Sequence, residues 1–186
     1  MRALSLALVY ALTSYLTCTT AWAASYEQKA LKFEQQAQWT EARRAWQAEL
    51  KQSPKNLDAR YHLAQILEIS GHLNDAQALY EKNIQIGRHL RTTVALSQLY
   101  LKQKKRSKAI KLLKKSTKIF KNEAVPWYLL AKLAMQDKQT KQAQYYFQKS
   151  LKSDPLNAFA HLRYAQFLSH QKKHAQAIKH AKKALR

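Results

Sequence analysis

The sequence of 186 residues contains little of what tight turns and cross-links require: 2 glycines, 3 prolines and 1 cysteine. Glycine and proline supply the backbone angles of tight turns, so their scarcity leaves little material for hairpins or long loops. Two isolated glycines also exclude a glycine-rich phosphate-binding loop. Ala, Leu, Gln, Lys and Glu dominate instead, and these are good helix formers. The composition therefore predicts an all-α protein.

Acidic residues are also few, at 11 against 33 lysines and arginines, which gives a net charge of +22. A field of this sign attracts polyanions such as nucleic acid, anionic lipid or lipopolysaccharide. Most carboxylates lie in the first half of the sequence and alternate with Lys and Arg, as on a solvated helical surface. A general acid–base pair needs a pocket that perturbs a pKa, and nothing in the sequence indicates one. We therefore expect no enzymatic activity and no catalytic residues.

The first residues have the pattern of a signal peptide. Arg2 supplies a positive charge, Ala3–Leu16 is an apolar run, and Ala21–Ala23 has the small-x-small form of a cleavage site. The run is shorter than the ~20 residues that a membrane-spanning helix needs, so cleavage after Ala23 is favoured over an uncleaved anchor. The residues before Cys18 do not form the motif that precedes a lipid-modified cysteine. We predict a signal peptide over residues 1–23.

Removal of residues 1–23 would take away the only cysteine and leave 32 basic and 11 acidic residues. The mature chain would then have no disulfide, no thiolate metal site and no cysteine nucleophile. It would be exported, with the periplasm as the favoured location and secretion as the alternative.

An alanine recurs at a nearly constant interval along the chain. The separations between successive copies are 34, 33, 34 and 34 residues, for Ala42, Ala76, Ala109, Ala143 and Ala177. A small residue at a fixed place suits the close crossing of two helices. The residue four positions later lies on the same helical face and is usually aromatic or large and apolar. The interval predicts five consecutive pairs of helices.

The stretch Ala124–Asn157 is the clearest copy of this unit. Its marker residues, in order, are Trp127, Leu130, Ala131, Ala143, Phe147 and Pro155. This pattern resembles the tetratricopeptide repeat, whose period is about 34 residues. The resemblance covers residues 24–186, with repeats at about 24–56, 57–89, 90–123, 124–157 and 158–186. It implies a right-handed superhelical solenoid of helix-turn-helix repeats with a concave inner surface.

The resemblance also implies which residues would bind a partner. Ligands of this family usually lie in the concave groove, which the fifth and ninth residues of each first helix line. Transferred to this sequence, these positions are Tyr61, Gln65, Val94, Gln98, Tyr128, Lys132, Leu162 and Gln166, and Arg91 and Arg163 lie next to the same face. From this set, the predicted partner-binding residues are Tyr61, Gln65, Arg91, Gln98, Tyr128, Lys132, Arg163 and Gln166. Such a mixture of aromatic, amide and cationic groups suits an extended peptide. The alternative is that these side chains only solvate the groove.

The third repeat is the most basic, with 11 basic residues and 1 acidic residue over 90–123. Five of its lysines recur every three or four residues, which predicts one face of the second helix, opposite Ala109 and Leu113. This candidate polyanion patch consists of Lys104, Lys108, Lys111, Lys115 and Lys118. The fifth repeat has 7 basic residues and no acidic one. A basic face that only keeps the protein soluble is the alternative.

The 7 histidines do not form a convincing metal site. His170 and His174 are four residues apart, but His174 falls beyond the expected turn between two helices, and no third ligand follows at suitable spacing. We therefore predict solvated histidines, no metal, no cofactor and no small-molecule substrate. Together with the predicted export, the resemblance to the tetratricopeptide repeat implies a non-enzymatic scaffold of the bacterial cell envelope that binds a protein partner from an envelope assembly. The alternative is a protein that binds polyanions or an anionic membrane surface through repeats three and five.

Overall fold

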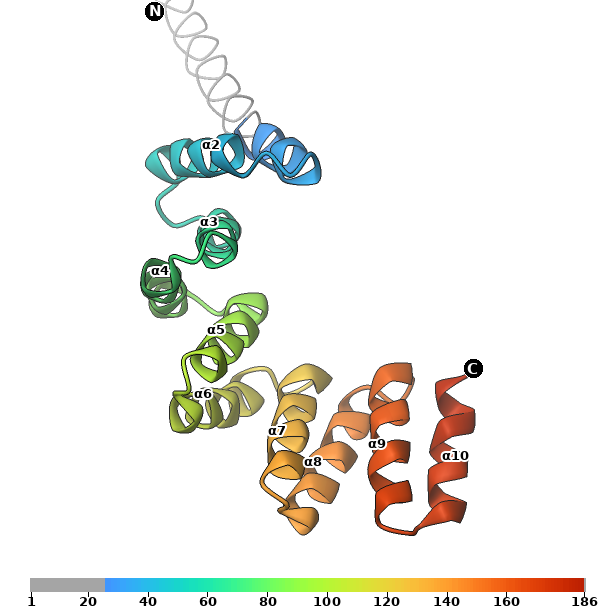
Figure 1. Cartoon of the computed structure of the whole chain (residues 1–186). Coiled ribbons are helices and arrows are strands. Elements are labelled where there is room, and N and C mark those ends of the chain that lie inside the picture. The colour runs from blue at the N-terminus through green and yellow to red at the C-terminus, as the bar shows by residue number, and fades with distance from the viewer. Residues whose placement is uncertain (1–25, 186) are drawn as a thin grey trace, which may run out of the picture. The chain divides into compact units, whose positions relative to one another are not determined.

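The computed structural model describes residues 26–185, so the predicted signal peptide and its cleavage site lie outside the described residues. Within this range every regular element is a helix (Figure 1). The chain divides into two compact units, Met1–His89 and Leu90–Arg186. Among residues 26–185, no helix is long and apolar enough to cross a bilayer.

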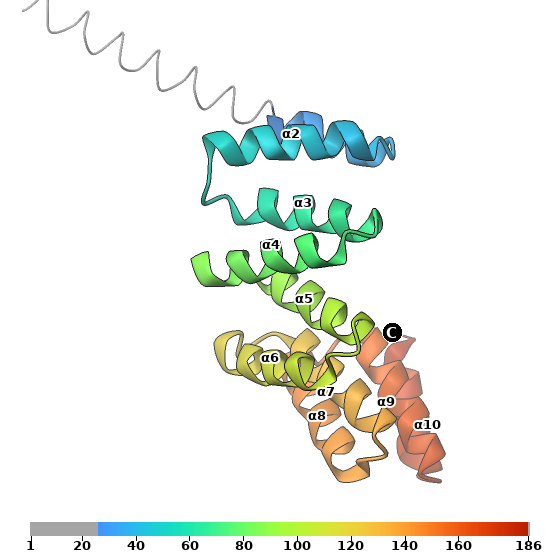
Figure 2. The same cartoon turned by 60° about the vertical axis from the view of Figure 1, so that its left-hand side comes forward.

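In the first unit, residues 26–35 are helical, and α2 (Trp39–Gln52), α3 (Leu57–Ile69) and α4 (Leu73–Ile86) follow. The second unit contains α5 (Leu90–Lys102), α6 (Arg106–Ile119), α7 (Ala124–Gln136), α8 (Thr140–Ser153), α9 (Ala158–His170) and α10 (His174–Ala184). The helices pack as neighbours in chain order, α3 with α4, α5 with α6, α7 with α8, and α9 with α10 (Figure 2). The predicted all-α fold of helix-turn-helix pairs is confirmed.

The recurring alanines lie at the centre of these pairs, as predicted. All five are between 0 and 8% exposed. The residue four positions later is also buried in the first four repeats, where it is Trp46, Tyr80, Leu113 or Phe147. Close helix crossings thus leave room for a methyl group at one position and a large side chain one turn later.

The turn inside each pair has the same backbone form. One residue in each turn has a positive φ, between 55° and 82°, at Ala37, Gly71, Lys104, Lys138 and Lys172. These positions are spaced like the alanines. This left-handed conformation allows the chain to reverse after the first helix, and only Gly71 adopts it without steric cost.

Buried polar side chains tie the end of a second helix to the start of its first helix. The Asn83 side-chain amide donates to the Leu57 carbonyl at 2.8 Å, and the Ser150 hydroxyl donates to the Ala124 carbonyl at 3.0 Å. The α3 and α9 helices also begin with asparagine caps, since Asn56 and Asn157 accept hydrogen bonds from Ala59 N and Ala160 N. These bonds satisfy backbone groups that a helix terminus leaves open.

Candidate functional site

The face of α7 that is not buried in the core carries the central residues of the candidate site. Leu130, Ala131 and Ala134 face the core. Tyr128, Lys132, Met135 and Gln136 follow one another at helical spacing on another side of α7, and all four line hollows of the surface. The same helix therefore supplies both the core packing and one wall of two neighbouring hollows.

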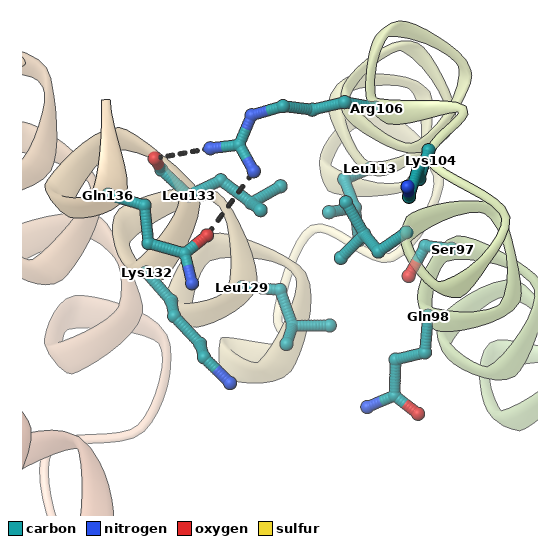
Figure 3. Close-up of a pocket in the computed structure, with 10 residues that line it drawn as sticks. Ser97, Gln98, Lys104, Arg106, Leu113, Leu129, Lys132, Leu133 and Gln136 are labelled. Atoms are coloured by element: carbon teal, nitrogen blue, oxygen red, sulfur yellow. Dashed lines mark hydrogen bonds between the residues drawn. The ribbon is translucent and has the colours of Figure 1, made fainter.

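The first hollow lies between α5, the start of α6 and α7, and has a volume of about 520 Å³. Its apolar lining consists of Leu101, Leu113, Leu129 and Leu133. Figure 3 shows Gln98 of α5 and Lys132 of α7 extending from opposite walls, at the end away from Arg106. The hollow thus combines an apolar floor with an amide and an ammonium group at its edge.

Arg106, the first residue of α6, links α6 to α7 at the other end of this hollow. Its guanidinium donates to the Leu133 carbonyl at 2.8 Å, to Gln136 Oε1 at 3.2 Å and to Asp137 Oδ1 at 2.7 Å (Figure 3 draws the first two). The Leu133 carbonyl lies in the last turn of α7, where a cation is favourable. Arg106 therefore fixes the start of α6 against the end of α7.

The second hollow lies between α7 and α9 and has a volume of about 360 Å³. The rings of Tyr128 and Phe159 meet edge to face, with centroids 5.2 Å apart. The Arg163 guanidinium lies 5.0 Å from the centroid of Phe159, within the range of a cation–π interaction. Burial raises the pKa of the Tyr128 hydroxyl, although the positive charge of Arg163 opposes this rise. Tyr128 is therefore an uncharged hydroxyl that can donate or accept.

The lining of both hollows is cationic. Lys104, Arg106, Lys132 and Arg163 line one or the other, and neither is lined by any Asp or Glu among the described residues. Lys132 and Gln136 line both hollows, so the two are adjacent and form one strip across α5, α7 and α9. We call this strip, with its two hollows, the α5–α7–α9 groove.

The structure places five of the eight predicted partner-binding residues on this groove. They are Gln98, Tyr128, Lys132, Arg163 and Gln166. Arg91 is exposed at the start of α5 and lines neither hollow. Tyr61 and Gln65 lie on α3 in the first unit and are half-buried. Tyr61 packs against the rings of His62, Tyr80 and His89, at centroid distances of 5.4, 6.1 and 5.5 Å.

Several lining residues were not predicted from the sequence. Phe159, Met135 and Gln136 line the groove beside the predicted residues. Helical spacing could have predicted two of them. Gln136 lies one turn beyond Lys132, and Phe159 lies one turn before Arg163, so each shares a helical face with a predicted residue. The contact of Phe159 with Tyr128 depends on how α9 packs on α7, which residue spacing alone does not give.

The predicted polyanion patch is not a single helical face. Lys108, Lys111, Lys115 and Lys118 are exposed on α6. Lys104 precedes α6, which begins at Arg106, and its φ of 60° places it in the turn. Its side chain lines the first hollow instead. The prediction that Lys104 lies on the second helix is therefore wrong, because the lysine spacing continues through a turn without interruption.

The prediction of solvated histidines is wrong for His161, which is 3% exposed. Its Nε2 lies 2.9 Å from the Pro155 carbonyl oxygen, and its Nδ1 lies 2.9 Å from Nδ1 of His180. A carbonyl only accepts, so His161 Nε2–H donates to Pro155, and in the neutral pair of rings His161 Nδ1 accepts from His180 Nδ1–H. His170 and His174 lie on different helices, as expected. Residues 26–185 contain no group of three or more His, Cys, Asp or Glu placed to hold a metal.

The His161–His180 pair predicts a pH dependence of stability. Burial lowers the pKa of His180, and the neighbouring His161, Lys183 and Lys179 lower it further; the Tyr164 ring also packs on it, with centroids 4.7 Å apart. As the pH falls below the ordinary histidine pKa of about 6.5, the unfolded chain binds a proton that the folded chain resists. Stability therefore decreases as the pH falls through this range, until the lowered pKa of folded His180 is reached.

Thermal unfolding followed by circular dichroism at pH 7.5 and pH 5.5 tests this. The fall in Tm between the two pH values should be smaller in His180→Gln, whose amide can still donate to His161 but does not titrate. His174→Gln is the matched control, since His174 is exposed at the start of α10. An equal fall in Tm in wild type and His180→Gln contradicts the prediction.

Comparison with known proteins identifies the repeats. Three family models, each described as "Tetratricopeptide repeat", match residues 28–89, residues 91–123 and 124–155, and residues 146–179. No curated protein sequence matches the chain significantly.

Similar solved structures have the same fold at low sequence identity. MamA from Desulfovibrio magneticus RS-1 (residue 41 to the end) has a TM-score of 0.67 and 19% identity, covering 88% of this chain and 93% of that chain. PilF of Pseudomonas aeruginosa has a TM-score of 0.76 and 20% identity, and the match covers 90% of this chain and 77% of that chain. YrrB, described as a TPR protein with an unusual peptide-binding site, has a TM-score of 0.58 and 15% identity, covering 86% and 83%.

Proposed function

Because this chain is a tetratricopeptide-repeat protein, we propose that it is a non-enzymatic scaffold that binds a segment of a protein partner along the α5–α7–α9 groove. One observation carries the proposal: two adjacent hollows share Lys132 and Gln136 and are lined by the first helices of three successive repeats. A continuous strip of this kind suits an extended segment better than a compact ligand, which would occupy one hollow.

The chemistry of the groove supports a peptide ligand. Gln98, Gln136 and Gln166 offer side-chain amides, which can pair with backbone N–H and C=O groups of an extended chain. Tyr128 and Phe159 offer apolar surface for side chains of the ligand. The peptide-binding site ascribed to YrrB, a protein of the same fold, is consistent with this use of the fold.

We further propose that the chain acts in the bacterial cell envelope. The basis is the sequence pattern of residues 1–23, which predicts export and cleavage after Ala23. The partner would then be a component of an envelope assembly. Fractionation of cells that express the full chain with a C-terminal tag tests this, and the mature protein should begin at Ala24. A protein that retains residues 1–23 in the cytoplasm contradicts the proposal.

Affinity capture with matched variants tests the binding function. The tagged full chain is purified from an envelope extract of its host, and co-purifying proteins are identified by mass spectrometry. A partner that uses the groove should be reduced about tenfold or more by Tyr128→Ala combined with Lys132→Ala, because an aromatic contact and a charge are lost together. Lys108→Ala with Lys115→Ala removes two exposed charges from α6 and should change the recovery little.

The opposite result would favour the polyanion hypothesis. If the α6 variant loses its ligand, the groove variant keeps it, and binding weakens steeply with salt, the lysines of α6 carry the interaction instead. If neither variant changes the co-purifying proteins, the groove is not the binding surface.

A further inference from the structure

We propose that the bound segment carries an internal Asp or Glu next to a large apolar residue. The acidic side chain meets Lys132, and the apolar side chain enters the hollow between α7 and α9, where it covers Phe159. This inference rests on the proposed function and specifies the chemistry of its partner. It follows from the charges, the unused hydrogen-bonding groups and the apolar surface of the α5–α7–α9 groove.

The charge of the groove selects an acidic ligand. Four cationic side chains line the two hollows, and no carboxylate lines either of them in the part of the chain that the structure describes. Arg106 is already paired with Asp137 at 2.7 Å. The remaining cations, Lys104, Lys132 and Arg163, face a ligand without a neutralising partner in the lining. Complementary charge both attracts such a segment and disfavours a basic one.

Lys132 is the cation best placed to recognise the acidic side chain. Its side chain is exposed, and its ammonium has no hydrogen-bond or ion-pair partner among residues 26–185. It lines both hollows, so its ammonium lies at the middle of the strip. Arg163 is partly engaged, since it donates to Gln166 Oε1 at 3.1 Å and covers Phe159. A carboxylate at Lys132 would form a charge-assisted hydrogen bond without breaking an existing one.

The central position of Lys132 favours an internal acidic side chain over a C-terminal carboxylate. A segment that occupies both hollows must continue in both directions past Lys132. A chain end held at Lys132 would leave one hollow empty. The inference therefore assigns the carboxylate to the side chain of an Asp or Glu.

The apolar residue is assigned to the hollow between α7 and α9. Tyr128, Met135, Phe147 and Phe159 all line it, and Phe159 is 50% exposed although it is a large aromatic residue. An apolar side chain that covers Phe159 would remove this surface from water, which is favourable. Met135 adds an unbranched side chain that adapts to different ligand shapes.

A single-stranded nucleic acid fits the same groove less well. Its bases bind by stacking on open aromatic faces. Arg163 covers part of Phe159, and the Tyr128 ring meets Phe159 edge to face. The cations of the groove could hold phosphates, but Phe159 is the one exposed aromatic side chain among the described residues that line it, so the groove offers no row of rings for successive bases.

A random peptide library tests the inference with short peptides in place of the natural partner. Phage that display random 12-residue peptides are selected on the immobilised purified chain, and bound peptides are eluted and sequenced. The inference expects enrichment of peptides in which Asp or Glu lies beside or within two residues of Leu, Ile, Met, Phe, Tyr or Trp. An oligothymidine and a heparin probe, added as competitors, should displace these peptides only at concentrations far above the peptide Kd.

Affinities of the most enriched peptide, measured by fluorescence polarisation, then locate its contacts. Lys132→Gln should weaken binding about tenfold, the typical effect of losing one charge-assisted hydrogen bond, and replacing the acidic residue of the peptide by its amide should do the same. Lys115→Gln removes an equal charge from exposed α6 and should change the Kd less than twofold. Phe159→Ala should weaken binding about tenfold. Ile178→Ala should change the Kd little, because Ile178 is 56% exposed on α10 and lines neither hollow. C-terminal amidation of the peptide should have no effect.

The possible failures separate the two proposals. Peptides that bind the groove but show no acidic preference, or that lose affinity only on C-terminal amidation, overturn the inference and leave the scaffold function standing. Displacement by oligothymidine at the peptide Kd also overturns it, in favour of a nucleic acid. If no enriched peptide is sensitive to Lys132→Gln or Phe159→Ala, both the inference and the groove function are contradicted.

Discussion

We expect Phe147→Ala to lower the free energy of unfolding by about 3–5 kcal/mol, the usual effect of truncating a fully buried phenylalanine. Phe147 is 1% exposed and lies at the centre of the core between α7, α8 and α9. Its ring centroid lies 5.2 Å from that of Tyr164 and 5.6 Å from that of Phe167. The substitution removes these contacts and leaves a cavity that the surrounding helices can only partly fill.

Urea denaturation followed by circular dichroism at 222 nm measures this loss. Leu156→Ala is the control, because Leu156 is 90% exposed and should change the stability by less than about 0.5 kcal/mol. Phe147→Leu keeps most of the side-chain volume, so its loss of unfolding free energy should lie between those of Phe147→Ala and Leu156→Ala. If Phe147→Ala costs no more than Leu156→Ala, the packing described for α7, α8 and α9 is wrong. Phe147 also lines the second hollow of the groove, so its loss should weaken ligand binding as well.

Trp46→Ala should destabilise the first unit by a similar amount, about 3–5 kcal/mol. Trp46 is fully buried and stacks on His62, with ring centroids 4.8 Å apart and an interplanar angle of 13°. Its Nε1–H donates to Glu34 Oε1 at 2.8 Å, and Glu34 also lies 3.1 Å from Nδ1 of His62. Truncation therefore removes the largest core side chain of this unit together with a hydrogen bond.

A second substitution separates packing from hydrogen bonding. Trp46→Phe keeps most of the ring but not the N–H group, and should cost roughly 1–2 kcal/mol, since Glu34 retains His62 and solvent as partners. Trp39→Ala is a matched control in the same helix, because Trp39 is 37% exposed and should cost much less. Equal losses for Trp39→Ala and Trp46→Ala in urea denaturation would mean that Trp46 is not a core residue.

The helix pairs and the core could be predicted from the sequence because they depend on local spacing. Ala143 and Phe147 lie four residues apart on one helix, and the 34-residue interval repeats that relation along the chain. Gln98, Tyr128 and Lys132 were predicted to line a groove because the resemblance to the tetratricopeptide repeat implies which positions of each first helix face a ligand.

The remaining features depend on contacts between helices or on turns that lack a clear signal. His161 and His180 are 19 residues apart and meet only because α10 packs on α9. Lys104 was predicted to lie on the helix because no residue before α6 marks its start. The N-cap residue is Lys105, whose side chain makes no capping hydrogen bond. Phe159 lies on α9 and Tyr128 on α7, so spacing along one helix could not predict their contact.

The hydrogen bonds of Arg106 have a consequence for the thermodynamics of recognition. Because one guanidinium links the start of α6 to the Leu133 carbonyl of α7 and to Asp137, which follows α7, the α6 and α7 sides of the first hollow are held together before a ligand arrives. A binding site that is already ordered loses less conformational entropy on association, and the ligand alone must become ordered. For the segment proposed to bind here, this end of the groove would therefore be ordered in advance, and most of the entropic cost of binding would fall on the segment itself.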